Sequence, residues 1–116
     1  MTTYTGGCHC GQIAFEVDAE IDKVIDCNCS MCAKRGGLLA FVPADHLRLK
    51  TPATQLATYT FNKHRIQHHF CPVCGIAPLG RGTDRSGNAM WSINVRCLEG
   101  VDIAALDVQH YDGRSA

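Results

Sequence analysis

Apolar and polar residues alternate with a period of two along most of the chain, and this pattern predicts a mainly β architecture. Ile13, Phe15 and Val17 share one face of a first predicted strand. The clearest alternation runs from Ala89 to Cys97, where every second residue is apolar. Further strands are predicted over residues 24–27, 38–42, 56–61 and 66–70.

Helix is predicted only in short pieces, because strong helical periodicity is scarce. Ser30 is expected to cap a helical turn that stops at the glycine pair beginning with Gly36. Asp102 is expected to cap a second turn, over residues 103–106.

Two segments rich in proline, glycine or charge are predicted to be irregular. Residues 44–53 carry turn-forming residues, and residues 80–87 are expected to form a mobile, charged loop. The chain has no internal repeat, and its length suits one domain, so we predict a single domain over residues 1–116.

The balance of charged residues argues against strongly charged partners. Lysine plus arginine equal aspartate plus glutamate at 11 each, so nucleic acid and anionic membranes are not predicted partners. The N-terminus lacks the pattern of a signal peptide, and no apolar run approaches the roughly 18 residues of a membrane span. We therefore expect a cytoplasmic protein, in which reduced thiols favour metal binding over disulfides.

Seven of the eight cysteines fall into three short groups. Sulfurs two or three residues apart are spaced to bind one metal ion from one loop, whereas disulfides usually join distant segments. A secreted disulfide scaffold would not explain such grouping. The groups are Cys8 and Cys10; Cys27, Cys29 and Cys32; and Cys71 and Cys74.

The third group has the pattern of a zinc knuckle, in which Gly75 allows a sharp turn and main-chain N–H groups face the sulfurs. A knuckle supplies two ligands, and Cys8 and Cys10 form a second pair that can complete a tetrahedral structural site with Cys71 and Cys74. A thioredoxin-like redox motif is the competing interpretation, but such a motif opens a helix after a strand, and here a glycine and then a proline follow.

The middle group leaves Cys27, Cys29 and Cys32 with no fourth cysteine nearby in sequence. Three protein ligands are typical of a zinc ion kept open for chemistry, and zinc acidifies a thiol or water in the open position. The alternative is that Cys97 or a histidine closes this site as well. We expect Cys97 to pack as a small hydrophobe, and we expect His68 and His69 to lie on opposite faces of their strand.

With these groups placed, the chain resembles the glutathione-dependent formaldehyde-activating enzyme and centromere protein V family. The match covers Gly7-Cys-His-Cys-Gly11, Cys27-Asn-Cys-Ser-Met-Cys32, Phe70-Cys-Pro-Val-Cys-Gly75 and Asn94-Val-Arg-Cys-Leu-Glu-Gly-Val-Asp102. The resemblance implies a β-tent of stacked antiparallel sheets around a structural zinc. It also implies structural ligands at Cys8, Cys10, Cys71 and Cys74, and catalytic zinc ligands at Cys27, Cys29 and Cys32.

The family's named activity joins glutathione and formaldehyde to S-hydroxymethylglutathione. Our first hypothesis is accordingly a zinc-dependent carbon–sulfur lyase, with two zinc ions, acting on a small thiol such as glutathione or on its carbonyl adduct. The chain is short for a glutathione-assigned member and offers only scattered arginines, such as Arg81 and Arg85, for the tripeptide's carboxylates. A non-enzymatic zinc-binding interaction module is the alternative, and a methionine sulfoxide reductase with Cys97 as nucleophile is a third possibility.

Overall fold

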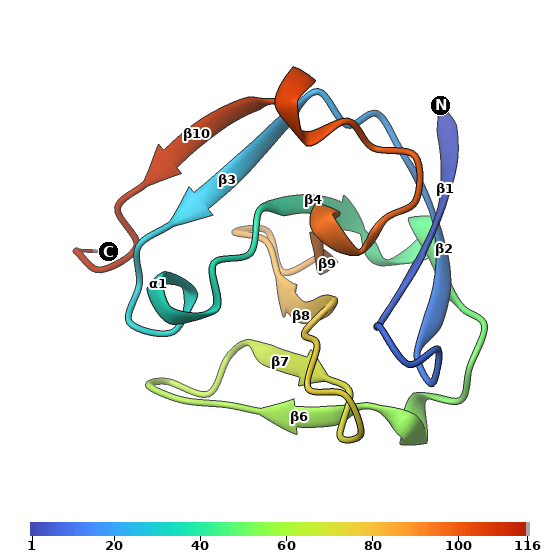
Figure 1. The fold of residues 1–116 in the computed structure, drawn as a ribbon. Coiled ribbons are helices and arrows are strands. Elements are labelled where there is room, and N and C mark those ends of the chain that lie inside the picture. The colour runs from blue at the N-terminus through green and yellow to red at the C-terminus, as the bar shows by residue number, and fades with distance from the viewer. Residues whose placement is uncertain (116) are drawn as a thin grey trace.

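A computed structural model describes residues 1–115 as two β-sheets with only short helical turns (Figure 1). A small sheet has the order β1-β2-β5, and a main sheet has the order β10-β3-β4-β9-β8-β7-β6. The strands are β1 (Thr2–Gly7), β2 (Ala14–Ala19), β3 (Lys23–Cys27), β4 (Leu39–Pro43), β5 (Leu47–Leu49), β6 (Ala57–Tyr59), β7 (Gln67–Phe70), β8 (Leu79–Thr83), β9 (Ala89–Asn94) and β10 (Asp107–Tyr111). Helix α1 spans Cys32–Arg35, and single 3₁₀ turns lie at Ala44–His46, Ala53–Gln55, Val95–Cys97 and Ile103–Ala105.

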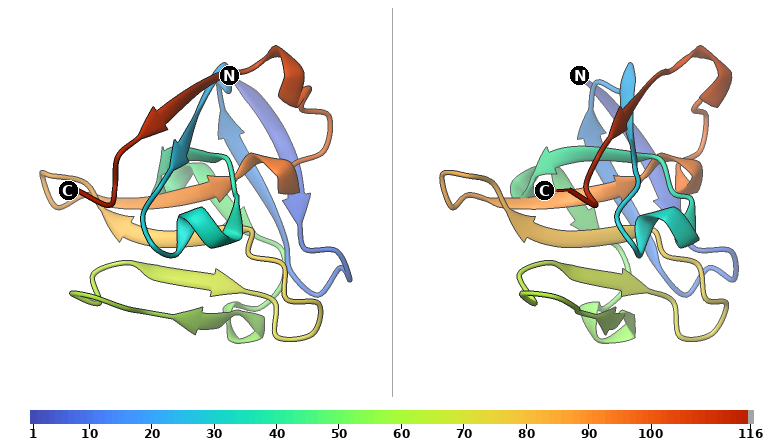
Figure 2. Two further views of the ribbon diagram at one scale, coloured as in Figure 1. Left: turned by 60° about the vertical axis from the view of Figure 1, so that its left-hand side comes forward. Right: turned by 90° about the vertical axis from the view of Figure 1, so that its left-hand side faces the viewer.

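The hydrophobic core is formed where one face of the small sheet meets one face of the main sheet. From the small sheet, β2 buries alternate residues, including Phe15 and Val17. From the main sheet, β9 buries Trp91 and Ile93 and leaves Ser92 between them partly exposed. The period-two pattern of the sequence therefore indicates which face of each strand is buried. Figure 2 shows that the small sheet packs beside the end of the main sheet.

The strand predicted over Ala89–Cys97 is confirmed up to Asn94, where it gives way to a 3₁₀ turn. The Asn94 side chain accepts a hydrogen bond from the Arg96 backbone N–H at 3.2 Å, and this cap turns the chain. Val95 is nevertheless fully buried. The apolar period thus continues through the turn, which is why the sequence alone suggested a longer strand.

The prediction of a mobile loop over residues 80–87 is wrong. Its first half belongs to β8, which lies between β7 and β9 in the main sheet. Only the turn from Asp84 is irregular, and the Asp84 carboxylate accepts hydrogen bonds from the backbone N–H groups of Ser86 and Asn88 at 2.9 and 2.8 Å. The glycine of this segment at position 80 marks a close approach to Ser92 rather than flexibility.

Other expectations need smaller corrections. Strand β10 pairs in parallel with β3, so the described sheets are not antiparallel throughout. Helix α1 has Met31 rather than Ser30 at its N-cap, without a side-chain hydrogen bond, although it ends at Gly36 in the left-handed conformation as predicted. The cap at Asp102 is confirmed by a hydrogen bond from the Ala104 N–H at 3.2 Å. Within residues 1–115, no helix has the length and apolar character needed to cross a bilayer.

Substitutions can distinguish how much each face of the main sheet contributes to stability. Ile93→Ala removes a fully buried side chain, so we expect the free energy of unfolding to fall by about 2–5 kcal/mol in urea denaturation. Phe41→Ala, on the opposite face of neighbouring β4, is the control; Phe41 is 54% exposed, so a loss of about 1 kcal/mol or less is expected. Equal losses would contradict the assignment of the core to one face.

Candidate metal centres

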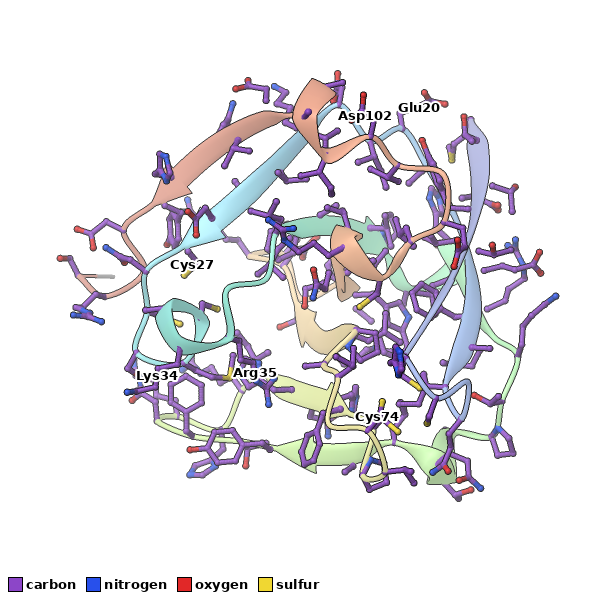
Figure 3. All side chains as sticks on the ribbon, viewed as in Figure 1. Glu20, Cys27, Lys34, Arg35, Cys74 and Asp102 are labelled. Carbon is purple, nitrogen blue, oxygen red and sulfur yellow. The ribbon has the colours of Figure 1, made fainter. Side chains whose placement is uncertain are left out.

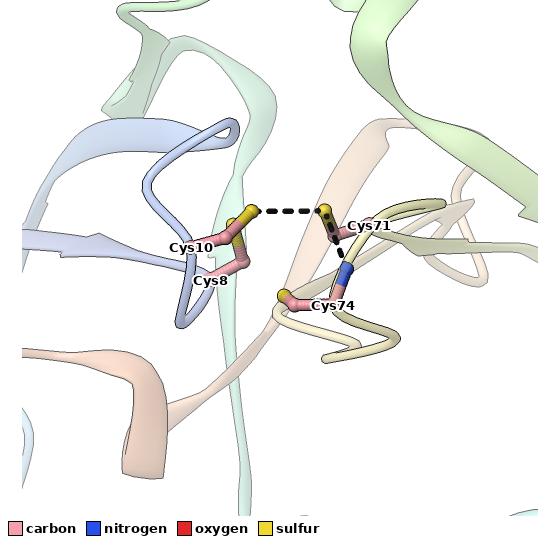
Figure 4. A group of neighbouring side chains, drawn as sticks. All are labelled: Cys8, Cys10, Cys71 and Cys74. Atoms are coloured by element: carbon pink, nitrogen blue, oxygen red, sulfur yellow. Dashed lines mark hydrogen bonds between the residues drawn. The ribbon is translucent and has the colours of Figure 1, made fainter.

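Four cysteine sulfurs meet where the turn after β1 faces the turn after β7 (Figure 4). The Sγ atoms of Cys8, Cys10, Cys71 and Cys74 all lie within 4.8 Å of one another. Cys10 Sγ is 3.6 Å from Cys71 Sγ and 3.7 Å from Cys8 Sγ. We call these residues the four-cysteine cluster. It joins a loop of the small sheet to a loop of the main sheet.

Local backbone geometry explains how the loops present these sulfurs. In the second loop, Gly75 adopts a φ of 81°, its N–H bonds to the Cys71 carbonyl at 2.9 Å, and the Cys71 N–H bonds to the Ile76 carbonyl at 2.9 Å. Only a residue without a Cβ adopts that φ readily. The N–H groups of Val73 and Cys74 then point at Cys71 Sγ, both at 3.4 Å. The predicted knuckle geometry is therefore present.

The second group forms a separate three-cysteine cluster at the end of β3. Cys27 is the last residue of that strand, Cys29 lies in the following turn and Cys32 opens α1. Their Sγ atoms also lie within 4.8 Å of one another. The N–H of Cys29 points at Cys27 Sγ and that of Cys32 at Cys29 Sγ, each at 3.4 Å. In the part of the chain that the structure describes, no fourth cysteine, histidine or carboxylate joins this group.

Electrostatics within the clusters favour a bound cation. Burial, followed by the neighbouring Cys29 sulfur, raises the pKa of Cys32 to about 12. Although burial acts in the opposite direction, the N–H of Cys32 lowers the pKa of Cys29. Hydrogen bonding to the Ile76 N–H lowers the pKa of Cys74 to about 6. Several thiolates share each site only if a positive charge offsets their repulsion, and thiolate sulfurs are zinc ligands, so the two clusters are consistent with two zinc sites.

Asn28 ties the C-terminal segment to the three-cysteine cluster. Its N–H donates to the Tyr111 carbonyl at 3.1 Å, its Nδ2 donates to Asp112 Oδ1 at 3.0 Å, and its Oδ1 accepts from the Arg114 N–H at 3.0 Å. This holds Gly113 so close that a Cβ built there would lie 2.5 Å from Cys27 Sγ. Nothing in the sequence pattern singles out this segment as part of the site. The Asp-Gly pair is a turn signal, but it does not reveal that the turn packs against a metal site.

The three-cysteine cluster opens into a cleft of about 850 Å³ on the face of the main sheet opposite the core. Strand register places Phe41, Ser92, Gly80 and His68 in one row across β4, β9, β8 and β7, and all four line the cleft. Its other lining residues include Ile25, Cys27, Cys29, Met31, Cys32, Arg35, Leu39, Phe61, Ile66, Ile76, Met90, Tyr111 and Gly113.

His68 and His69 lie on opposite faces of β7, as predicted. His69 is buried on the core side beside Trp91, with Nδ1 2.9 Å from Thr58 Oγ1. His68 faces the cleft and stacks on Phe61, with ring centroids 5.3 Å apart. Burial, and then the nearby positive charge of Arg35, lowers the pKa of His68, so its imidazole is uncharged at neutral pH.

Cys97 is placed away from the three-cysteine cluster. It lies in the 3₁₀ turn after β9, and burial, followed by the charges of Cys8 and Cys74, raises its pKa to about 11. A raised pKa keeps the sulfur protonated and poorly nucleophilic. The arrangement supports the expectation that Cys97 packs as a hydrophobic residue, and within residues 1–115 neither Cys97 nor a histidine closes the three-cysteine cluster.

Comparison with known proteins gives matches over most of the chain. A family model described as glutathione-dependent formaldehyde-activating enzyme matches residues 3–112. A crystal structure of a Rhodobacter sphaeroides protein is similar to this chain at 31% sequence identity and a TM-score of 0.77. That similarity covers 90% of this chain and 99% of the Rhodobacter chain.

The two clusters should differ in what their loss does to the protein. Cys74→Ser is expected to remove one zinc ion per chain and to unfold the contact between the sheets, because that cluster joins loops distant in sequence. Cys29→Ser is expected to remove the other ion and to leave the circular dichroism spectrum unchanged. Metal content by mass spectrometry, with Cys97→Ser as a control that retains both ions, checks this. Unfolding caused by Cys29→Ser but not by Cys74→Ser would contradict the division.

The packing of Gly113 predicts an effect confined to one cluster. Gly113→Ala places a methyl group against Cys27 Sγ, so the affinity of the three-cysteine cluster for zinc should fall at least about tenfold. Metal affinity commonly falls by this much when a residue that contacts a metal ligand is changed. Chelator competition on the purified protein measures both ions. Gln109→Ala, on exposed β10, is the matched control. An unchanged affinity in the Gly113 variant would show that the segment does not press on the site.

Proposed function

Since the chain belongs to the glutathione-dependent formaldehyde-activating enzyme family, we propose that it is a zinc-dependent carbon–sulfur lyase acting at the three-cysteine cluster. Its substrates are a thiol and a carbonyl compound, or the adduct that the two form. The observation that carries the proposal is the opening of a three-sulfur cluster into a large cleft. We further propose that residues 1–116 act as one zinc-binding domain in the cytoplasm.

We assign the two clusters different roles. The four-cysteine cluster would hold the sheets together, because its sulfurs come from loops of both sheets and would supply all four ligands of a structural zinc ion. Cys27, Cys29 and Cys32 would hold the second ion. Zinc bound there would supply Lewis acidity, which lowers the pKa of a substrate thiol. The backbone N–H groups of Cys29 and Cys32 stabilise the cluster's negative charge and fix the directions of its sulfurs.

The reaction in the forming direction makes one bond between the thiol sulfur and the carbonyl carbon. The thiol proton leaves the sulfur, and a proton is added to the carbonyl oxygen, so the sum is R–SH plus H₂C=O giving R–S–CH₂–OH. His68 is the imidazole that lines the cleft, and its uncharged ring accepts a proton. We propose that His68 takes the thiol proton and returns it to the oxygen.

Two other interpretations have less support. A methionine sulfoxide reductase would need Cys97 as a reactive thiolate, and the raised pKa of Cys97 opposes that role. A non-enzymatic interaction module would present its apolar residues on an open surface. Here Phe41, Ile66 and Ile76 instead line the cleft that contains the three cysteines.

Glutathione and formaldehyde provide the direct test of the lyase, because the family suggests them as substrates. Two-dimensional exchange NMR with ¹³C-formaldehyde should show interconversion of free and adduct carbon faster than in buffer alone. Cys29→Ser should return the rate to that of buffer, whereas Cys97→Ser should retain it. If the zinc-loaded protein accelerates exchange of neither glutathione nor simpler thiols, the lyase proposal fails.

The role of His68 predicts a pH dependence. Because burial lowers its pKa below the ordinary 6.5, more than half of the His68 rings are uncharged at pH 6.5, and the midpoint of the acidic decline in activity should lie below that pH. His68→Gln should lower kcat/KM by about 10²-fold and remove this decline, since the titrating base is gone. Profiles from pH 5 to 8, with His110→Gln as an exposed control, measure it. The same acidic decline in both variants would exclude His68.

A further inference from the structure

We propose that the cleft selects a thiol with an apolar body and a single anionic group, and that Arg35 binds the anion. Turnover of such a thiol rests on the proposed function, but its binding does not. The proposal therefore names a substrate class that differs from a zwitterionic peptide thiol.

The hollow in the main sheet is produced by small residues in neighbouring strands. Gly80 and Gly82 of β8 face the cleft, beside Ser92 of β9. A Cβ at position 80 would lie 2.5 Å from Ser92 Oγ, whereas one at position 82 would lie 3.6 Å from Ile66 Cγ1. A Cβ at position 82 would meet Ile66 only at ordinary van der Waals distance, so the floor at Gly82 has room for an apolar group packed against Ile66.

The walls around that floor are apolar and unusually exposed. Phe41 is 54% and Ile66 50% exposed, and Leu39, Ile76 and Met90 add to the same lining. Exposed apolar residues gathered in a concave site indicate a bound apolar group. The amide groups of a peptide would lose their water here without gaining enough partners, which costs free energy for each unpaired group.

Arg35 is the cation available to a ligand in this cleft. Its guanidinium lies over the Phe70 ring, 5.9 Å from the centroid, and forms no ion pair with residues 1–115. Figure 3 shows Arg35 between α1 and the strands below it, while Lys34 lies to the outside. Arg35 follows Cys32 by one helical turn, so a single ligand can place its anion at Arg35 and its sulfur at the cluster.

The other charged side chains that line the cleft already interact with neighbouring groups of this chain. Arg81 stacks on Trp91 at 4.6 Å from the ring centroid, in the row of residues that faces the core side. The Asp84 carboxylate accepts hydrogen bonds from its own turn, including one from Asn88 Nδ2 at 3.2 Å. Among residues 1–115, the side chains that line the cleft therefore offer a ligand one cation and no uncommitted carboxylate. Glutathione, with two carboxylates and an ammonium group, fits this charge pattern poorly, whereas a monoanionic apolar thiol fits it well.

Calorimetric titration of the zinc-loaded protein with three thiols tests the proposal without turnover. The probes are 4-(mercaptomethyl)benzoic acid, its uncharged analogue 4-methylbenzyl thiol, and glutathione. We expect the benzoic acid to bind at least about tenfold more tightly than either of the others. Glutathione binding as tightly as the benzoic acid, or an equal affinity of the two benzyl thiols, would overturn the proposal.

Variants separate the anion site from the apolar floor. Arg35→Gln should remove the preference for the carboxylate and leave the affinity for 4-methylbenzyl thiol unchanged, whereas Lys34→Gln should change neither. Gly82→Val should weaken both benzyl thiols at least about tenfold, because it fills the floor in a strand where valine is tolerated. If Arg35→Gln weakens both thiols equally, Arg35 only offsets the charge of the cluster, and the proposal fails.

The same titrations keep this proposal distinct from the lyase. Tight binding of the benzoic acid, with exchange of ¹³C-formaldehyde accelerated neither for this thiol nor for glutathione and simpler thiols, would support the selective cleft and refute the lyase. Accelerated exchange with glutathione, together with tighter binding of glutathione than of the benzoic acid, would support the lyase and refute the selective cleft.

Discussion

The approach of the Cys8–Cys10 turn to the Cys71–Cys74 turn is the contact on which the rest of the structure depends. These turns belong to different sheets and are separated by about sixty residues of chain, so closing them costs considerable conformational entropy. Four thiol groups within 4.8 Å gain little from one another without a cation. A metal ion at this point would convert a costly loop closure into a stable junction, which suits a chain with room for only a modest core.

With the sheets joined on one side, the two faces of the main sheet take different roles. One face packs against the small sheet and is buried around Trp91 and Ile93. In the part of the chain that the structure describes, no second sheet packs on the other face, and small residues in β8 and β9 deepen it into the cleft. The three-cysteine cluster stands at the edge of that open face, where β3 ends and α1 begins. The same alternation of side chains therefore supplies both stability and a binding surface.

Local patterns in the sequence were sufficient to predict the strands with clear alternation and the grouping of the cysteines. Spacing predicted the cysteine clusters because neighbouring sulfurs in one turn are constrained by a few backbone angles. Strand β10 escaped prediction, since its parallel pairing with β3 joins residues more than eighty positions apart. Gly80 and Gly82 were assigned to a loop because glycine usually signals a turn; in β8 they reflect close packing and an open floor, which only the neighbouring strands reveal. Gly113 also shows its role only through a neighbour distant in sequence, the Cys27 sulfur.

The central claim is that the two clusters differ in kind, one closed by four protein sulfurs and one open to a substrate sulfur. A crystal structure of the zinc-loaded protein soaked with 4-(mercaptomethyl)benzoic acid tests this claim most directly. We expect one ion held by Cys8, Cys10, Cys71 and Cys74 alone. We expect a second ion held by Cys27, Cys29 and Cys32 together with the soaked sulfur. A second ion with four protein ligands and no soaked sulfur would contradict it.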